Sequence, residues 1–460
     1  MNTLLVPVYW EDIEPQQGQF HFETVDGLIK QARQRDMHLI FLWFGLWKNA
    51  ESMYVPGWMK EDSQTYWRAQ SVTGEKLNSI SPLCEAAVQR DAHAFTQLLA
   101  HIREIDEKQS TVLLIQVENE IGLLGTDRDY SERANALFKS QIPAELATAL
   151  GLSGCWTDAF GDDAAEAFMA YHYASAVEQI ARAGSAAYPL PLYANAWLKQ
   201  YPWAAGTYPS GGPVPEVQHI WRAAAPTLCA LAPDIYVAYV PRVIDEYAAS
   251  SPDLPLIIPE VRKDATTASY ALYAFAHHRA LCYSPFGIED ITLPPESIAM
   301  PPASVMQELN IDPSAFDIRN SAQYLSQTYQ LVESLKPLLL ENRDTLQTFV
   351  KHHENDFGQF LHFSRLDATV SYAPRMESTP VASGGILELE ENTFLLFGMM
   401  FSVKFHPKSG QNVKVDVLEY SEGSFVDGIW TKRRTLNGDE KMSISLPASP
   451  SCVMVKLYTY

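Results

Sequence analysis

Short apolar runs alternate with longer segments of helical period over the first three quarters of the chain. Seven runs rich in Val, Ile, Leu and aromatic residues read as strands: 3–10, 38–45, 111–120, 189–197, 234–240, 254–261 and 281–289. Helical segments lie at 23–36, 85–108, 164–184, 267–281 and 320–342. This alternation predicts parallel strands joined by crossover helices, either in an open doubly wound sheet or in a closed (β/α)8 TIM barrel.

The residues that follow the predicted strands favour the barrel. No glycine-rich phosphate loop follows any strand, whereas polar and aromatic residues crowd the carboxyl ends of nearly all of them. In a barrel these ends form one mouth, where side chains far apart in sequence converge. We therefore expect an α/β barrel domain over residues 1–343.

The pattern changes from about residue 344 onward. Segments such as GGILELEENTFLLFGMMFSVKFH and NVKVDVLEYSEGSFVDGIW alternate apolar and polar residues and are separated by turn sequences. Such alternation is typical of antiparallel strands with one buried face. The expected second domain, residues 344–460, is a small antiparallel β-sandwich.

Composition excludes several classes of protein. The formal net charge of −21 and the scattered basic residues disfavour nucleic acid as a partner. The five cysteines have no CxxC or CxxH spacing, and adjacent histidines such as His277 and His278 do not chelate from one face, so we expect no metal and no cofactor. The chain has neither a long apolar run nor a signal peptide at its start, so as written we expect a cytoplasmic protein without a membrane partner.

Two predicted strands end in glutamates. The run LLIQVENEIG places Glu118 and Glu120 after an apolar segment, and LPLIIPEVRKD closes with Glu260. Buried carboxylates are costly unless they are hydrogen-bonded or used. Two carboxylates opposed across a barrel mouth suit glycoside hydrolysis, in which one protonates the leaving oxygen and the other attacks the anomeric carbon or activates water. The alternative is that these glutamates pair with Arg or Lys at the rim.

These motifs resemble those of a known family. QVENEIG is similar to the acid/base motif of retaining β-galactosidases of glycoside hydrolase families 35 and 42, in clan A. VYWEDIEPQQGQFHF (8–22), LWFGLWKN (42–49), PDIY (233–236), FVDGIW and KLYTY also resemble members that carry an extra β-domain. The resemblance implies that Glu120 is the general acid/base, Asn119 a ligand of the sugar 2-hydroxyl and Glu260 the nucleophile.

The clan places its two glutamates on strands four and seven, but here they end the third and sixth predicted strands. The resemblance therefore implies a barrel that lacks its first β/α unit, through a start assigned too far downstream or through real loss. If the true start lies upstream, the protein is periplasmic or secreted.

Further polar and aromatic residues fall at or just beyond strand ends, where sugars require aromatic platforms beside polar groups. The expected substrate contacts are Trp10, Glu11, Trp47, Lys48, Asn49, Asn195, Trp197, Tyr236 and Glu289. Several have an ordinary alternative: packing for the tryptophans, a turn for Asn195 and a rim salt bridge for Glu289. Tyr236 is expected to hydrogen-bond the nucleophile, with Tyr239 as a competitor.

The sequence thus predicts a retaining exo-β-glycosidase, first of all a β-galactosidase, that acts by double displacement. Its substrate would be a β-galactoside of an oligosaccharide or of a plant polysaccharide side chain. The alternatives are a β-glycosidase for another sugar and a non-catalytic carbohydrate-binding protein with a truncated barrel. The sequence leaves the oligomeric state open.

Overall fold

The computed structural model describes residues 1–298, 300–342, 344–410, 412–426 and 428–460. It divides into two compact units. One consists of Asn2–Asp234 and Glu246–Pro259, and the other of Met1, Ile235–Asp245 and Glu260–Tyr460. Among the described residues, no helix combines the length and the apolar character needed to cross a membrane.

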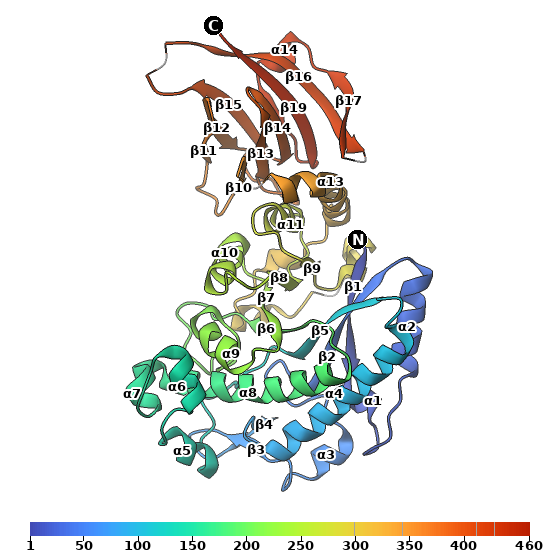
Figure 1. The fold of residues 1–460 in the computed structure, drawn as a ribbon, viewed down its shortest axis with the longest axis vertical. Helices are drawn as coiled ribbons and strands as arrows, with labels where there is room; N and C mark the ends of the chain where they lie inside the picture. The colour runs from blue at the N-terminus through green and yellow to red at the C-terminus, as the bar shows by residue number, and fades with distance from the viewer. Residues whose placement is uncertain (299, 343, 411, 427) are drawn as a thin grey trace. The chain divides into compact units, whose positions relative to one another are not determined.

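Five strands pair in parallel in the first unit (Figure 1). They are β1 (Thr3–Tyr9), β2 (His38–Lys48), β5 (Val112–Asn119), β6 (Leu192–Trp197) and β7 (Leu228–Ile235). The helices that follow them include α2 (Glu23–Gln34), α4 (Glu85–Asp106), α8 (Ala164–Ala187) and α9 (Gln218–Ala224). β2 and β5 are buried along most of their length, as expected for parallel strands covered on both faces.

The sheet continues with β8 (Ile257–Val261) and β9 (Cys282–Pro285), in the order β1-β2-β5-β6-β7-β8-β9. The helices α10 (Val240–Ser250) and α11 (Thr267–Ala276) follow β7 and β8. Seven strands that alternate with helices in the described part of the chain confirm the predicted barrel-type fold, with one β/α unit fewer there than the eight of a complete barrel.

One predicted strand was wrong. The run 234–240 was expected to be a strand, but β7 ends at Ile235 and α10 begins at Val240. Val240, Val243, Ile244 and Tyr247 are buried at helical spacing, so the apolar run spans the end of a strand and the start of a helix.

The second unit contains two antiparallel sheets, which confirms the predicted β-domain. The six-stranded sheet consists of β10 (Leu346–Val350), β13 (Ser383–Glu390), β14 (Thr393–Met399), β19 (Ser451–Thr459), β16 (Val415–Val426) and β17 (Ile429–Thr435). The four-stranded sheet consists of β11 (Gly358–His362), β12 (Leu366–Tyr372), β15 (Phe401–Pro407) and β18 (Ile444–Leu446). Side chains from both sheets form one apolar core.

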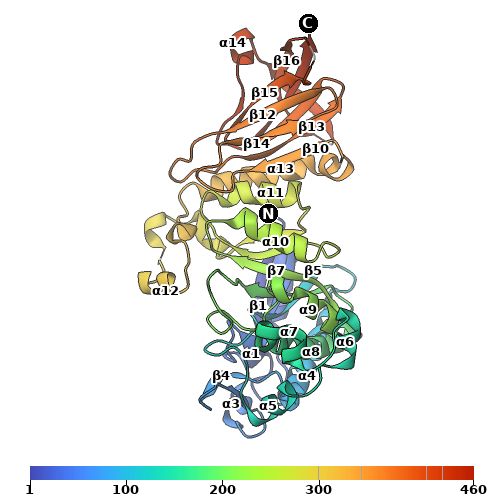
Figure 2. The same cartoon turned by 90° about the vertical axis from the view of Figure 1, so that its left-hand side faces the viewer.

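Two helices of the predicted barrel domain pack on this core (Figure 2). Leu272 of α11 and Leu335 of α13 (Ser321–Glu341) are fully buried within it. Ser269 Oγ donates a hydrogen bond to the carbonyl of Val381, 2.8 Å away. The predicted domain boundary after residue 343 stays a prediction, and residue 343 itself lies outside the described residues.

Candidate active site

The backbone at the end of β5 is fixed from two sides. Glu118 and Glu120 have φ angles of 62° and 47°, in the left-handed region that non-glycine residues seldom adopt. The N–H of Glu120 donates to Asn195 Oδ1 (2.9 Å), and its carbonyl accepts from the N–H of Ala50 (3.0 Å). Asn195 in turn donates from Nδ2 to Asp234 Oδ2, 2.6 Å away. The side chain of Asn195 therefore positions Glu120, and the predicted turn alternative for Asn195 was wrong because it lies within β6.

Asn119, the last residue of β5, has a buried side chain with an unused acceptor. Its carbonyl accepts from the N–H of Asn49 (3.2 Å), and the residue is only 1% exposed. Within the part of the chain that the structure describes, Asn119 Oδ1 has no hydrogen-bond partner. A buried acceptor without a donor is costly, so a ligand hydroxyl at this oxygen would recover free energy.

Glu118 does not lie at the rim. It is fully buried beside Asp91 of α4, and its carboxyl accepts from the backbone N–H of Trp47 (2.6 Å). Asp91 accepts from Trp43 Nε1 and from the N–H of Leu46, both at 2.8 Å. The carboxyls of Asp91 and Glu118 thus hold the backbone of β2 at Leu46 and Trp47.

Glu260 lies in β8, in the other unit, together with its tyrosine partner. The hydroxyl of Tyr236 donates to Glu260 Oε1 over 2.5 Å. The ring of Tyr236 stacks on Phe316 with centroids 5.8 Å apart and meets Phe286 edge-on at 6.1 Å. The tyrosine is thus oriented by its ring as well as by its hydroxyl.

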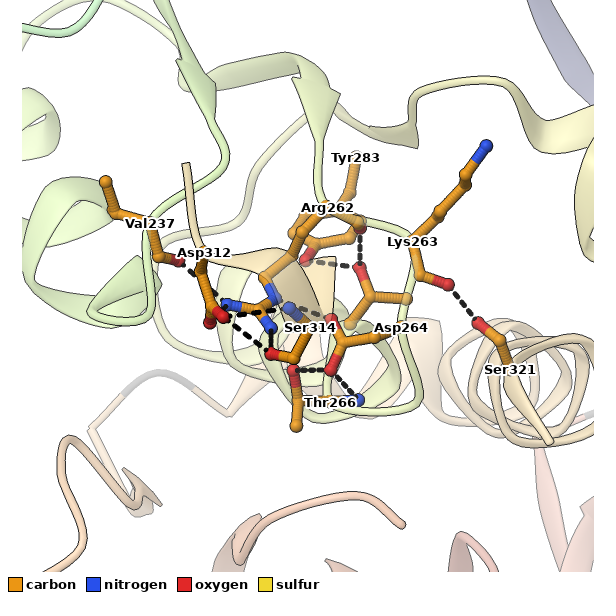
Figure 3. A network of polar contacts seen from close by, with 10 residues as sticks. Val237, Arg262, Lys263, Asp264, Thr266, Tyr283, Asp312, Ser314 and Ser321 are labelled. Atoms are coloured by element: carbon orange, nitrogen blue, oxygen red, sulfur yellow. Dashed lines mark hydrogen bonds and ion pairs between the residues drawn. The ribbon is translucent and has the colours of Figure 1, made fainter. Parts of the chain in front are cut away.

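Arg262, two residues after Glu260, ties together the segments around it (Figure 3). It is 1% exposed, and its guanidinium donates to Asp312 Oδ2 (2.8 Å), to Ser314 Oγ (2.7 Å) and to the carbonyl of Val237 (3.0 Å). A second ion pair joins its Nε to Asp264 Oδ1 at 2.5 Å. Burial opposes the charge of Arg262, but the two carboxylates outweigh burial and raise its pKa.

The Arg262 network also holds the segment that carries Phe316. The helix η5 (Pro313–Phe316) follows Asp312, and the N–H of Lys263 donates to the carbonyl of Ala315 (2.9 Å). Lys263 pairs with Asp290 Oδ2 at 2.5 Å. The ion pair expected of Glu289 is therefore made by its neighbour Asp290, while Glu289 is exposed in η3 (Ile288–Thr292).

Two predicted sugar platforms are core residues. Trp10 and Trp47 are 0% exposed, so neither presents a ring face to a ligand. Trp10 Nε1 donates to Glu14 Oε2, and Trp47 Nε1 donates to the carbonyl of Ile80, each over 2.9 Å. This corrects the expectation of sugar contact, because indole rings with satisfied N–H groups bury readily in a core.

The remaining predicted contacts of the first unit lie near strand ends. Glu11 of α1 (Trp10–Ile13) pairs with Lys60 at 3.0 Å. Lys48 ends β2, and its Nζ contacts Asn49 Oδ1. Trp197 is half-buried at the end of β6. The structure thus gathers Lys48 and Asn49 beside Asn119 through backbone pairing.

Three residues around the glutamates were missed from the sequence. Asp91 sits on the buried stripe of α4 formed by Ala87, Val88 and Ala94, and a lone carboxylate on such a stripe is a usable signal. Asp234 lies in the PDIY motif without having been singled out. Two of the contacts of Arg262, with Asp312 and Ser314, reach 50 positions or more along the chain, so no local pattern reveals them.

Two family models match parts of the chain. Residues 4–169 match the model of glycoside hydrolase family 42, described as Beta-galactosidase. This confirms the predicted resemblance to clan A glycoside hydrolases over these residues. Residues 325–446 match a model described as Domain of unknown function (DUF5597). None of the curated proteins compared with the chain matches it.

Solved structures of β-galactosidases show a weaker likeness. That from Bacillus circulans sp. alkalophilus is 13% identical with a TM-score of 0.45, over 62% of this chain and 46% of that one. That from Marinomonas ef1 is 14% identical with a TM-score of 0.46, over 73% and 57%. That from Halorubrum lacusprofundi is 16% identical with a TM-score of 0.42, over 61% and 48%. The chain spans about half the length of these proteins.

Proposed function

We propose that the protein is a retaining exo-β-galactosidase in which Glu260 is the nucleophile and Glu120 the general acid/base. The observation that carries the proposal is the hydrogen bond from Tyr236 to Glu260. A carboxylate that accepts a short bond from a fixed phenol is oriented, and its ionised form is favoured. A carboxylate nucleophile must be both ionised and oriented toward the carbon that it attacks.

Support for the partner role of Glu120 comes from its place in the fold. β5 and β8 belong to one seven-stranded sheet, and Glu120 directly follows the last residue of β5. The carboxyl ends of the strands of a barrel form its active-site face. The family match over residues 4–169, which includes Glu120, favours a galactoside as substrate.

The mechanism follows from these roles. One oxygen of Glu260 attacks the anomeric carbon, while Glu120 donates its proton to the leaving oxygen, so the glycosidic bond breaks and a glycosyl ester forms. A water molecule then gives its proton to Glu120 and attacks the same carbon, which releases the sugar and restores Glu260. Two inversions give net retention, and such enzymes place the two carboxyl groups about 5 to 5.5 Å apart.

Asn119 is the proposed ligand of the sugar 2-hydroxyl. Its buried Oδ1 has no partner among the described residues and accepts a hydroxyl hydrogen bond in this proposal. Hydrogen bonds to this hydroxyl strengthen in the transition state of glycoside hydrolysis. Asn119 would therefore act on the rate as well as on binding.

The test is hydrolysis of 4-nitrophenyl β-galactoside by the chain and by Glu120→Gln and Glu260→Gln, with Glu333→Gln as the control. Glu333 lies on α13, and its side chain is 72% exposed. We expect turnover by the wild type and the control, a loss on the order of a thousandfold in Glu260→Gln, and retention of configuration in the product. Unchanged turnover in both active-site variants would refute the assignment. Turnover of only another β-glycoside would retain the mechanism and correct the sugar.

A further inference from the structure

The pairing of β2 with β5 contains a large bulge. It breaks off after Trp43 and resumes at Lys48, opposite Asn119, so residues 44–47 face a single residue of β5, Glu118. Beyond the bulge, the N–H groups of Asn49 and Ala50 reach the carbonyls of Asn119 and Glu120. The shape of the bulge therefore decides where the last residues of β5 are held.

The bulge rests on two carboxyls. Asp91 Oδ2 accepts from the N–H of Leu46 at 2.8 Å, and Glu118 Oε2 accepts from the N–H of Trp47 at 2.6 Å. A Cβ at Gly45 would lie within 2.6 Å of Glu118 Oε1 and closer still to Asp91 Oδ2. The two oxygens thus flank the same point beneath Gly45, where only a glycine fits.

We propose that Asp91 and Glu118 share one proton, carried by Glu118, and that this acid–carboxylate pair positions Glu120 by holding the 44–47 bulge. The inference rests on the proposed function of Glu120. Asp91 and Glu118 are positioning residues, since neither is placed at the sugar.

Donor and acceptor counting places the proton. Both oxygens of Asp91 accept from protein N–H groups, those of Trp43 and Leu46. Glu118 Oε2 accepts from Trp47 at 2.6 Å, whereas Oε1 accepts a longer bond of 3.2 Å from the N–H of Leu46, which also donates to Asp91 Oδ2 at 2.8 Å. Of the four carboxyl oxygens, Glu118 Oε1 accepts over the longest distance, so it is the one that can carry a hydrogen and donate it to Asp91.

Electrostatics agrees with this placement. Both residues are 0% exposed, and two ionised carboxylates in contact there would repel strongly. Burial raises the pKa of both; the charge of Asp91 and the bond to Asp91 raise the pKa of Glu118 further, while the same bond lowers that of Asp91. Glu14 is a further carboxylate that acts on Asp91. The directions of these shifts agree with a proton on Glu118.

The placement predicts an asymmetry between amide substitutions. Glu118→Gln keeps an acceptor for Trp47 and supplies an N–H for Asp91, so it mimics the protonated acid. Asp91→Asn turns one acceptor into a donor that faces another donor. An acid/base residue that has shifted matters most for poor leaving groups, which require protonation, so the readout is kcat/KM for phenyl compared with 2,4-dinitrophenyl β-galactoside.

We expect Asp91→Asn to lower kcat/KM for the phenyl substrate on the order of tenfold more than for the dinitrophenyl substrate. The loss of kcat/KM in Glu118→Gln should be on the order of tenfold smaller than the loss in Glu118→Ala. The control is Asp106→Asn at the other end of β5, where Asp106 is buried, pairs with Arg33 and accepts from the N–H of Val112. Asp106→Asn should lower kcat/KM for both substrates by one common factor.

The inference would be overturned if Asp91→Asn lowered kcat/KM for both substrates by the same factor. It would also be overturned if Glu118→Gln and Glu118→Ala lost equal amounts of kcat/KM. Infrared spectroscopy of the folded wild type tests the proton without catalysis. At neutral pH, the difference spectrum between the wild type and Glu118→Gln should contain a carboxylic-acid C=O band that is separate from the one that Glu120→Gln removes; its absence from that difference spectrum also overturns the inference. Failure of the proposed function is separate, since it would show as no leaving-group dependence in Glu120→Gln while the infrared band remained.

Discussion

The hydroxyl of Tyr236 donates to Oε1 of Glu260 over 2.5 Å, and the tyrosine ring is clamped against Phe316. The bond orients the carboxylate of Glu260. The sequence left two tyrosines as candidates for this role, and Tyr236 makes the bond, whereas Tyr239 is 37% exposed.

We predict that Tyr236→Phe lowers kcat by about ten- to a hundredfold with little loss of stability. A hydrogen bond to a charged group contributes about 1.5–3 kcal/mol, while the stacking on Phe316 survives the change. Steady-state kinetics and thermal unfolding would check both parts. A larger loss of kcat in Tyr239→Phe than in Tyr236→Phe would contradict the assignment.

Arg262 should stabilise the second unit well beyond an ordinary ion pair. Arg262→Lys removes the planar guanidinium that binds Asp264, Asp312 and Ser314 at once. Because the site is buried, the free energy of unfolding should fall by roughly 3 kcal/mol. Arg319→Lys is the matched control, since Arg319 is half-exposed and pairs with Asp317 and Glu377, and it should cost about 1 kcal/mol or less. Urea unfolding measures both, and equal losses would show that burial of Arg262 adds nothing.

The role of Asn119 can be separated from that of Asn195 with a modified substrate. Asn119→Ala should lower kcat/KM for a β-galactoside on the order of tenfold, but should leave a 2-deoxy-β-galactoside nearly unaffected, because that substrate lacks the hydroxyl to be bound. Asn195→Ala releases the backbone N–H of Glu120 and should slow both substrates alike. Equal sensitivity of both substrates to Asn119→Ala would argue against contact with the 2-hydroxyl.

Stability should depend on the protonation of His172 in acid. Burial lowers the pKa of His172 to about 3, and its ring packs on Phe168 with centroids 4.4 Å apart. Below its unfolded pKa of about 6.5, the unfolded chain binds a proton that the folded one refuses, so stability is present above that pH and is lost as pH falls toward 3. His172→Phe should reduce the slope of the free energy of unfolding against pH by up to about 1.4 kcal/mol per pH unit. Urea midpoints between pH 4 and 7 would check the slope, and parallel slopes would contradict it.

Hydrophobic periodicity predicted the order of strands and helices because the spacing of apolar residues within each element reflects which of its faces is buried. It placed Glu120 and Glu260 at strand ends for the same reason. It missed the bulge at 44–47, since the predicted strand 38–45 shows no sign of a break in the sequence, and Asp91 and Glu118, whose carboxyls explain the bulge, lie far from it along the chain. Trp10 and Trp47 lie near strand ends as expected, but whether an indole faces a ligand or the core depends on neighbours far away in sequence.

Labelling with 2,4-dinitrophenyl 2-deoxy-2-fluoro-β-galactoside tests the central claim most directly. The fluorine slows both steps and the good leaving group restores the first, so the glycosyl ester accumulates. We predict stoichiometric modification, located by peptide mass spectrometry at Glu260, with loss of activity at the same rate. Modification of another carboxylate, or rapid turnover of galactosides without any trapped ester, would contradict the account.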